Sequence, residues 1–285
     1  MPPRSHLGPY PVDHAVVAHH ELDALTARFD DLGLSPEYGG RHDHDVTHNS
    51  LLGFDDGSYV ELISTVEPGA IPSKRAPFIG GDAGPCGWAV ETDDVEGVAN
   101  AVTEMAEPVG LTGRHTRETP AGDVAEWQLA YLGSGEPGTE FPFVIEDITP
   151  REYRITPTPS VTGTELTGID AMMIATADLD ALVGRYRQVF DLPAPERETA
   201  SGFDAEVARF PESAAVIATP NGDGWLADRV AEFGTLPCAT LLGTTDFDAT
   251  CDRGDEVPVD EWFGHRVGWL LAPNDVGGPL GVIER

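Results

Sequence analysis

Residues 12–32, VDHAVVAHHELDALTARFDDL, contain the pattern that decides the fold. An apolar run of strand length is followed by acidic residues, and then Leu22, Leu25 and Phe29 recur at helical spacing. The same pattern of a strand followed by a helix returns in residues 169–189, IDAMMIATADLDALVGRYRQV. Seven identities align the two segments at an offset of 157, and they pair Asp13, Ala18, Leu22, Asp23, Ala24, Leu25 and Arg28 with Asp170, Ala175, Leu179, Asp180, Ala181, Leu182 and Arg185. Similarity at this separation indicates a duplicated unit.

Each helix is followed by β-like sequence. Residues 49–63, NSLLGFDDGSYVELI, contain two apolar runs around Asp56–Gly57, a favoured hairpin pair. Residues 203–220 repeat this arrangement, and two weaker strand–helix copies begin at residues 87 and 238. The chain therefore reads as four βαβββ modules in an α+β protein. The Pro/Thr-rich segment 155–168 predicts a linker between a first domain, 1–154, and a second, 169–285.

The charge balance is strongly acidic. Aspartate and glutamate number 49 against 17 lysines and arginines, the net charge is −32, and the single lysine is Lys74. Self-repulsion of this size strains a compact protein in dilute salt, whereas molar salt screens it within about 3 Å. We therefore expect a halophilic origin, with an ordinary acidic protein as the alternative. Nucleic acids and anionic membranes are not expected partners because both require basic patches.

The sequence predicts a cytoplasmic protein. It has no apolar run of 18 residues and no signal-peptide pattern at its start. Its three cysteines, Cys86, Cys238 and Cys251, are too far apart for a zinc knuckle and odd in number, which suits a reducing compartment. Nucleotide-binding, catalytic-triad and zinc-protease motifs are absent.

The segments DHAVVAHHELDAL, GGRH, THN, GSYVELI, GWAVETDDVE and PFVIED, spread over residues 12–148, resemble the glyoxalase-like domain proteins of the vicinal oxygen chelate superfamily. The second half resembles the superfamily through its module pattern alone. The resemblance implies paired modules that form curled sheets around a cavity. There a divalent metal often chelates adjacent oxygens of a small-molecule substrate, with ligands from the first and last strands of each module.

Carried over by position, the resemblance implies a metal held by His14, Glu61 and Glu146, with Gly87 at the fourth position unable to ligate. The alternation of side chains along residues 58–62 agrees with the position assigned to Glu61. Val60 and Leu62 share the face expected to pack on the helix, which turns Tyr59 and Glu61 towards the concave side. An inward carboxylate is costly unless it is paired or bound to metal. One imidazole and two carboxylates suit Fe²⁺, Mn²⁺, Ni²⁺ or Zn²⁺. The alternative is that His14 and Glu61 bond to each other or to an arginine.

The stretch RHDHDVTH, residues 41–48, is interpreted as lining the mouth of the cavity. Arg41 is expected to clamp a carboxylate or phosphate, and His48 to take part in proton transfer, with Glu61 as the third catalytic candidate. Asp43, His44 and Asp45 are expected to be solvated turn residues. Arg41, His48, Asn49, Tyr59 and Trp127 form the expected substrate-binding set. For Trp127 the residue pattern favours the alternative, that its side chain fills the cavity.

Three functions remain open: a metal-dependent lyase, isomerase or dioxygenase acting on a dicarbonyl, hydroxycarbonyl or catechol-like substrate; a metal-free protein that sequesters small molecules; or a scaffold with an empty cavity. Ring-cleaving dioxygenases also have two such domains, but the matching positions here are Ala171, Ala239 or Cys238, and Glu284, so both histidines are missing. The second domain is therefore expected to support or cap the first, or to form a homodimer surface.

Overall fold

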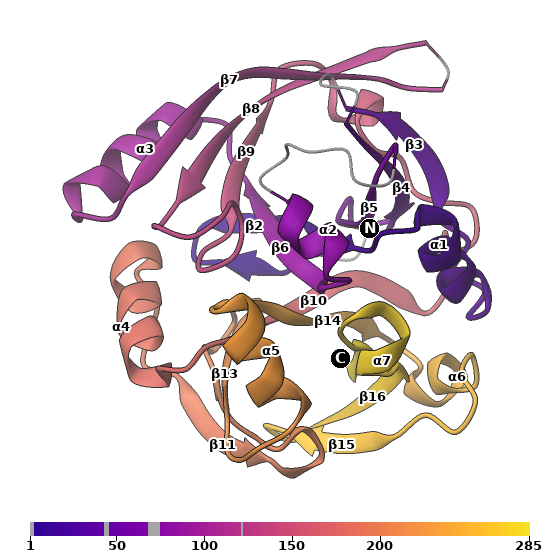
Figure 1. Ribbon diagram of the computed structural model, residues 1–285, viewed down its shortest axis with the longest axis vertical. Coiled ribbons are helices and arrows are strands. Elements are labelled where there is room, and N and C mark those ends of the chain that lie inside the picture. Colours follow the sequence, from indigo (N-terminus) through magenta and orange to yellow (C-terminus); the bar gives the residue numbers. More distant parts are fainter. Residues whose placement is uncertain (1–2, 43–45, 68–74, 121) are drawn as a thin grey trace.

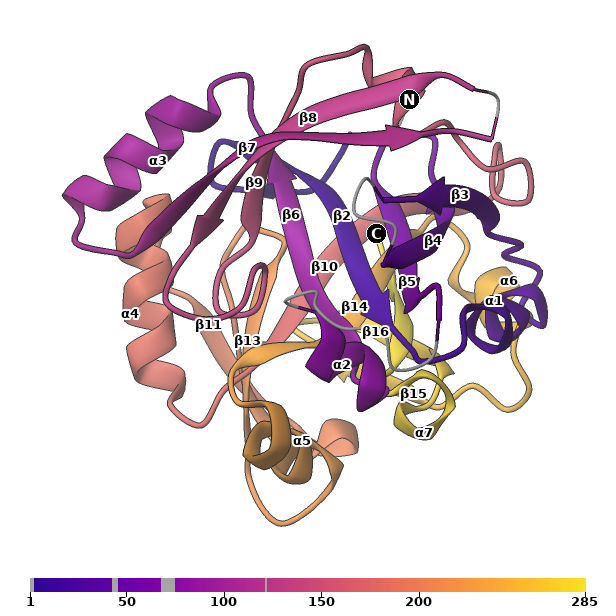
Figure 2. The same cartoon turned by 45° about the horizontal axis from the view of Figure 1, so that its top comes forward.

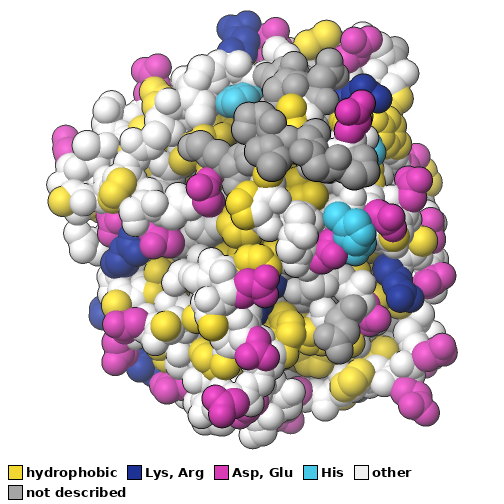
Figure 3. All heavy atoms as spheres, in the orientation of Figure 1, with side chains coloured by type: hydrophobic (Ala, Val, Ile, Leu, Met, Phe, Trp, Pro, Cys, Tyr) yellow, Lys and Arg dark blue, Asp and Glu magenta, His cyan; other side chains and the backbone are white. Residues whose placement is uncertain are grey.

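The structure, a computed structural model, describes residues 3–42, 46–67, 75–120 and 122–285. It consists of two similar halves, one above the other in Figure 1, each built on a curled mixed sheet with few helices. The predicted α+β fold of four βαβββ modules is confirmed. Acidic side chains are distributed over both halves on the face seen in Figure 3. Within the described residues, no helix is long and apolar enough to cross a membrane.

The first sheet has the strand order β3-β4-β5-β2-β6-β9-β8-β7, with β1 paired to β2. Its strands are β1 (His6–Leu7), β2 (Tyr10–Ala18), β3 (Glu37–Arg41), β4 (Thr47–Gly53), β5 (Tyr59–Thr65), β6 (Gly84–Glu91), β7 (Val109–Glu118), β8 (Val124–Leu132) and β9 (Phe143–Asp147). The helices of this half are α1 (Leu22–Asp30), α2 (Ala76–Gly80), α3 (Val95–Glu104) and the short 3-10 helix η1 (Arg151–Tyr153).

The second sheet repeats this order as β11-β12-β13-β10-β14-β17-β16-β15. Its strands are β10 (Leu166–Ala175), β11 (Glu196–Ala200), β12 (Ala205–Arg209), β13 (Ala215–Pro220), β14 (Leu236–Thr244), β15 (Val259–Trp262), β16 (His265–Leu271) and β17 (Leu280–Glu284). Its helices are α4 (Leu179–Phe190), η2 (Ser201–Phe203), α5 (Trp225–Phe233), α6 (Phe247–Cys251) and α7 (Pro273–Val276). Strand β10 begins inside the segment interpreted as a linker.

Acidic residues at helix starts have a local structural role. Asp94, Asp178 and Asp246 occupy the N-caps of α3, α4 and α6, and each side chain accepts a hydrogen bond from a backbone N–H of the first turn. Such caps satisfy donors that the helix leaves unpaired. The expected stripe of Leu22, Leu25 and Phe29 is buried on α1. Part of the acidity therefore defines where helices begin.

The two halves share one hydrophobic core. It includes Val17 and Trp88 from the first sheet together with Met172 and Leu242 from the second. Arg229 of α5 strengthens the junction: its two terminal nitrogens donate to the carbonyls of Ala83 and Pro85 in the first half and of Pro237 and Gly277 in the second, at 2.5–2.8 Å. Figure 2 shows the two sheets stacked behind one another at this junction.

Gly277 lies in a close backbone contact between the halves. Its φ is +72°, and an added Cβ would lie 1.8 Å from the Asp82 carbonyl oxygen and 2.6 Å from the Gly84 nitrogen. We expect Gly277→Ala to lower the free energy of unfolding by at least about 2 kcal/mol, measured by urea denaturation in molar KCl. The control is Gly163→Ala, since Gly163 has a similar φ of +67° but no atom within 4 Å of an added Cβ. Equal losses in both variants would contradict a tight junction.

Candidate active-site cavity

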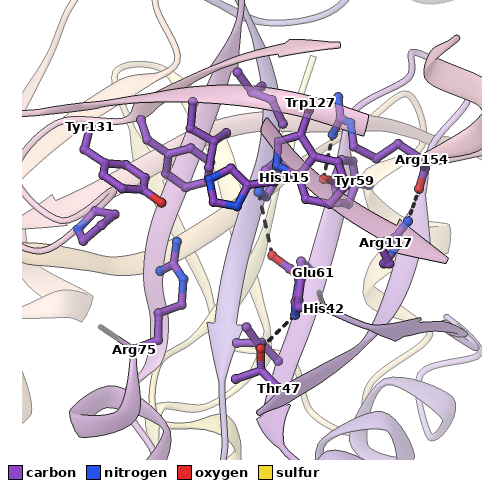
Figure 4. A pocket seen from close by; sticks show the side chains of 16 residues that line it. His42, Thr47, Tyr59, Glu61, Arg75, His115, Arg117, Trp127, Tyr131 and Arg154 are labelled. Atoms are coloured by element: carbon purple, nitrogen blue, oxygen red, sulfur yellow. Dashed lines mark hydrogen bonds and ion pairs between the residues drawn. The ribbon is translucent and has the colours of Figure 1, made fainter. Parts of the chain in front are cut away.

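The concave side of the first sheet encloses a cavity of about 290 Å³ (Figure 4). All of its described lining residues belong to the first half of the chain. They are His14, His42, Thr47, Tyr59, Glu61, Ile63, Arg75, His115, Arg117, Trp127, Leu129, Tyr131, Pro137, Phe143, Ile145 and Arg154. Alternation along β5 explains part of this set. Tyr59, Glu61 and Ile63 face the cavity, whereas Val60 and Leu62 belong to the core that includes α1.

His14 is held by a buried network of charges. Its Nδ1 lies 2.5 Å from Asp13 Oδ1, its ring stacks on Tyr59, and its Nε2 is 3.8 Å from Glu61 Oε2. Burial alone would raise the pKa of Asp13, but Arg154 and Arg151 hold that pKa well below its usual range. Asp13 is therefore ionised. A histidine whose other nitrogen is bonded to a carboxylate has a fixed ring orientation, as is common for metal ligands.

Glu61 stays ionised although its side chain is buried. Its Oε1 accepts a hydrogen bond from Asn49 Nδ2 at 2.7 Å and lies 3.3 Å from His42 Nε2. Burial raises the pKa of Glu61, but the hydrogen bond and charge of His42, with smaller effects from His14 and Asn49, lower it far more. The cavity thus contains an ionised carboxylate between two imidazoles, and this arrangement suits a bound cation.

The stretch RHDHDVTH contributes different residues from those expected. His42 and Thr47 line the cavity, and His42 Nδ1 lies 2.8 Å from Thr47 Oγ1. Arg41 and His48 are paired across β3 and β4 but do not line the cavity, and Arg41 is exposed in a neighbouring groove. In a strand, a shift of one residue exchanges the two faces. Asp43, His44 and Asp45 lie outside the described residues.

The other expected substrate-binding residues lie at the site. Tyr59 and Trp127 line the cavity, and Asn49 reaches it through its bond to Glu61. His115 stacks on Trp127.

Glu146 is not brought to this cluster. Its Oε2 instead accepts a hydrogen bond from the Val95 backbone N–H at the start of α3, at 2.9 Å. Strand register explains the difference. Glu61 lies opposite Val16, two residues after His14, and the residue opposite Ala89, two residues after Gly87, is Phe143. By register, the position that matches Glu61 is therefore Phe143, three residues before Glu146, and a phenylalanine cannot bind a metal.

The second module thus contributes no metal donor at either matching position. At Gly87, an added Cβ would lie 2.6 Å from a terminal nitrogen of Arg75, so a guanidinium lies beside the position of the missing side chain. The imidazole and carboxylate donors grouped at Glu61 are His14, Glu61 itself and His42, all from the first module. These three suit a divalent cation chemically, as two imidazoles and one carboxylate. Their ligand atoms do not all lie within 4.8 Å of one another. His115 of the second module also lines the cavity, where its ring stacks on Trp127.

One compact group of metal-type ligands occurs in the described part of the chain, and it lies outside the cavity. His19, His20 and Asp82 have ligand atoms that all lie within 4.8 Å of one another. His20 Nδ1 is 2.6 Å from Asp82 Oδ1, and this hydrogen bond raises the pKa of His20. The ion pair between His20 and Asp82 accounts for the proximity of these groups.

The concave side of the second sheet is filled by its own side chains. Ala171, Cys238 and Ala239 are buried in a cluster that includes Trp262, with Phe203 and Trp269 packed against it. Glu284 pairs with Arg266 at 2.8 Å. The dioxygenase-type positions of this half thus provide no group of metal donors.

Comparison with known proteins agrees with this architecture. The profile of the Glyoxalase-like domain matches residues 12–190. A hypothetical protein from Staphylococcus aureus superposes with a TM-score of 0.65 at 14% identity, covering 96% of this chain and 99% of that one. A mutant 4-hydroxymandelate synthase from Streptomyces coelicolor gives 0.65 at 12% identity, covering 100% and 93%.

A fusion of a xylose isomerase-like TIM barrel with 4-hydroxyphenylpyruvate dioxygenase gives a TM-score of 0.58 at 16% identity, covering 100% of this chain and 50% of that one. A search of curated proteins found no match. At these identities the structural similarities establish the fold alone, which is the two-domain fold of vicinal oxygen chelate proteins.

Proposed function

This chain belongs to the glyoxalase-like domain family, and from that premise we propose that it is a divalent-metal-dependent enzyme acting on a small oxygen-rich molecule. The observation that carries the proposal is the carboxylate of Glu61 between His14 and His42 in a cavity of small-molecule size. The substrate class is a dicarbonyl, hydroxycarbonyl or catechol-like compound. His14, Glu61 and His42 would hold the metal, and His42 takes the place first given to Glu146.

The metal would supply Lewis-acid polarisation of a substrate oxygen. The protein's own residues have separate tasks. Asp13 fixes the His14 ring, and Asn49 fixes the Glu61 carboxylate. Glu61 is ionised, which is the form that a general base needs, and its pKa would have to rise on substrate binding for it to take a proton from a carbon or hydroxyl next to a carbonyl. Trp127, Leu129 and Phe143 form an apolar wall that limits water around the reacting atoms.

A metal-free binding protein is the second candidate. Its support is the lack of a donor at Gly87 and Phe143, with Arg75 beside Gly87. In that case Glu61 would receive hydrogen bonds from a ligand instead of coordinating a metal.

Elemental analysis separates these functions. The protein would be purified without a tag or chelator in molar KCl, beside His14→Ala and His20→Ala variants. We expect about one Fe, Mn, Ni or Zn per chain, retained in His20→Ala and lost in His14→Ala. The His20 variant is the control because it disrupts the surface group of His19, His20 and Asp82. Metal lost only in His20→Ala, or absent throughout, would contradict the enzyme proposal and favour the binding protein.

A further inference from the structure

Arg117 is a buried arginine that forms no ion pair with any residue that the structure describes. Its side chain is 5% exposed, on β7 in the cavity wall. Among the residues that the structure describes, it donates one hydrogen bond, to the Arg154 backbone carbonyl, and has no carboxylate within salt-bridge distance; its Nε is buried without a partner. Burial lowers its pKa, and Glu61 is close enough to oppose this without pairing. Burying a charge without a partner is costly.

Two other buried arginines show how this protein normally satisfies the group. Arg154 pairs with Asp13 and Asp147 at 2.6–2.9 Å. Arg229 pairs with no carboxylate in the described part of the chain, but its terminal nitrogens donate to four carbonyls. Among the described residues, Arg117 has neither a carboxylate partner nor several carbonyl acceptors. It is thus a buried cation with unused donors at the edge of a cavity.

The charges of the cavity wall also favour an anionic ligand. The wall contains the three arginines Arg75, Arg117 and Arg154, while Glu61 is its one carboxylate among the described lining residues. Arg154 is already neutralised by its aspartates. Arg117 has no such neutralising partner among the described residues, and the same cavity is also lined by the apolar side chains of Trp127, Leu129 and Phe143. A small molecule with an apolar body and an anionic group complements this arrangement.

We propose that Arg117 is the anion-binding residue of this cavity and that the substrate carries a carboxylate or a phosphate in addition to the oxygens that face Glu61. The inference deepens the proposed function and rests on it for the word substrate. A guanidinium offers two parallel donors to either anion. The anion would satisfy Arg117, and the apolar wall would receive the body of the molecule.

Calorimetric titration at constant KCl tests this with three probes: benzoate, its neutral analogue benzamide, and inorganic phosphate. We expect one benzoate per chain, bound at least tenfold more tightly than benzamide, and at least tenfold weaker binding in Arg117→Met. Arg114→Gln is the matched control, because Arg114 lies three residues away on the same strand but is exposed and paired with Glu126. It should bind like the wild type. Phosphate binding that depends on Arg117 and exceeds that of benzoate would identify a phosphoryl group as the anion.

A stability measurement keeps the test meaningful. Because Arg117 forms no ion pair with the residues that the structure describes, Arg117→Met should be at least as resistant to urea as the wild type. A clear loss of resistance would show a structural role and overturn the proposal. So would anion binding that Arg117→Met leaves unchanged, or no anion binding in the wild type.

The His14→Ala variant separates this inference from the proposed function. Benzoate binding that is lost in His14→Ala but kept in Arg117→Met would place the carboxylate on the metal, which supports the enzyme and overturns the Arg117 inference. Binding that is kept in His14→Ala and lost in Arg117→Met supports the inference whether or not a metal is found.

Discussion

Asp13→Asn is expected to lower the free energy of unfolding by about 3–5 kcal/mol, the usual cost of removing one partner from a buried ion pair. Asp13 is fully buried and receives hydrogen bonds from Arg151 and Arg154. Asparagine keeps the shape but not the charge, so two guanidinium groups lose a shared counter-ion. The measurement is urea denaturation at pH 7 in molar KCl.

The pH dependence gives the same prediction a second readout. The pKa of Asp13 is held well below its ordinary value of 3.8 in the folded protein by Arg154 and Arg151. A depressed carboxyl pKa contributes stability that is present above the unfolded pKa and is lost as the pH falls towards the folded one. The wild type should therefore lose this contribution below about pH 4, whereas Asp13→Asn should lack that part of the dependence.

The internal repeat supplies the control for this experiment. Asp170 corresponds to Asp13 in the second half and pairs with a single, partly exposed arginine, Arg285. Asp170→Asn should cost clearly less. Equal losses in the two variants would contradict a special role for the network around Asp13.

Glu61→Gln is expected to weaken divalent-metal binding by roughly a hundredfold or more, which is at or beyond the range for residues that only orient a ligand. This prediction rests on the proposed function. Glutamine preserves the volume and can keep the bond from Asn49, but it removes the charge between His14 and His42. Affinity would be measured by competition with a chelating dye.

Glu146→Gln is the matched carboxylate control. Because Glu146 accepts a bond from the start of α3, its substitution should leave metal affinity unchanged and cost about 1 kcal/mol of stability or less. An effect on metal affinity equal to that of Glu61→Gln would restore the ligand set that the sequence suggested.

Much of this architecture could be predicted because it depends on periodicity. The repeat of residues 12–32 at 169–189 predicted the matching pairs β2–α1 and β10–α4. Asp56–Gly57 lies in the turn between β4 and β5, and Gly57 has the positive φ that such a turn requires. The alternation of Val60, Glu61 and Leu62 gave the orientation of Glu61 correctly.

The expected and the observed cavity residues differ at single positions within strands. His48 and Asn49 were assigned together to the substrate, yet neighbours in a strand face opposite sides. Since Asn49 shares the face of Glu61, the same rule would have selected Thr47 instead of His48. Arg117 and Arg154 could not be found in this way, because their positions depend on contacts between β7, η1 and β2 that no local pattern encodes.

The aromatic filling of the second half has a consequence for the division of labour between the duplicated modules. A cavity lined by ionised groups contributes little to the free energy of unfolding. A concave face filled by Trp262, Trp269 and Phe203 contributes much more, because these side chains bury a large apolar surface. Since both halves share one core, the tightly packed second half stabilises the first half, which contains the cavity. Duplication thus allows one copy to keep unfavourable charges ready for a ligand while the other keeps the whole molecule folded.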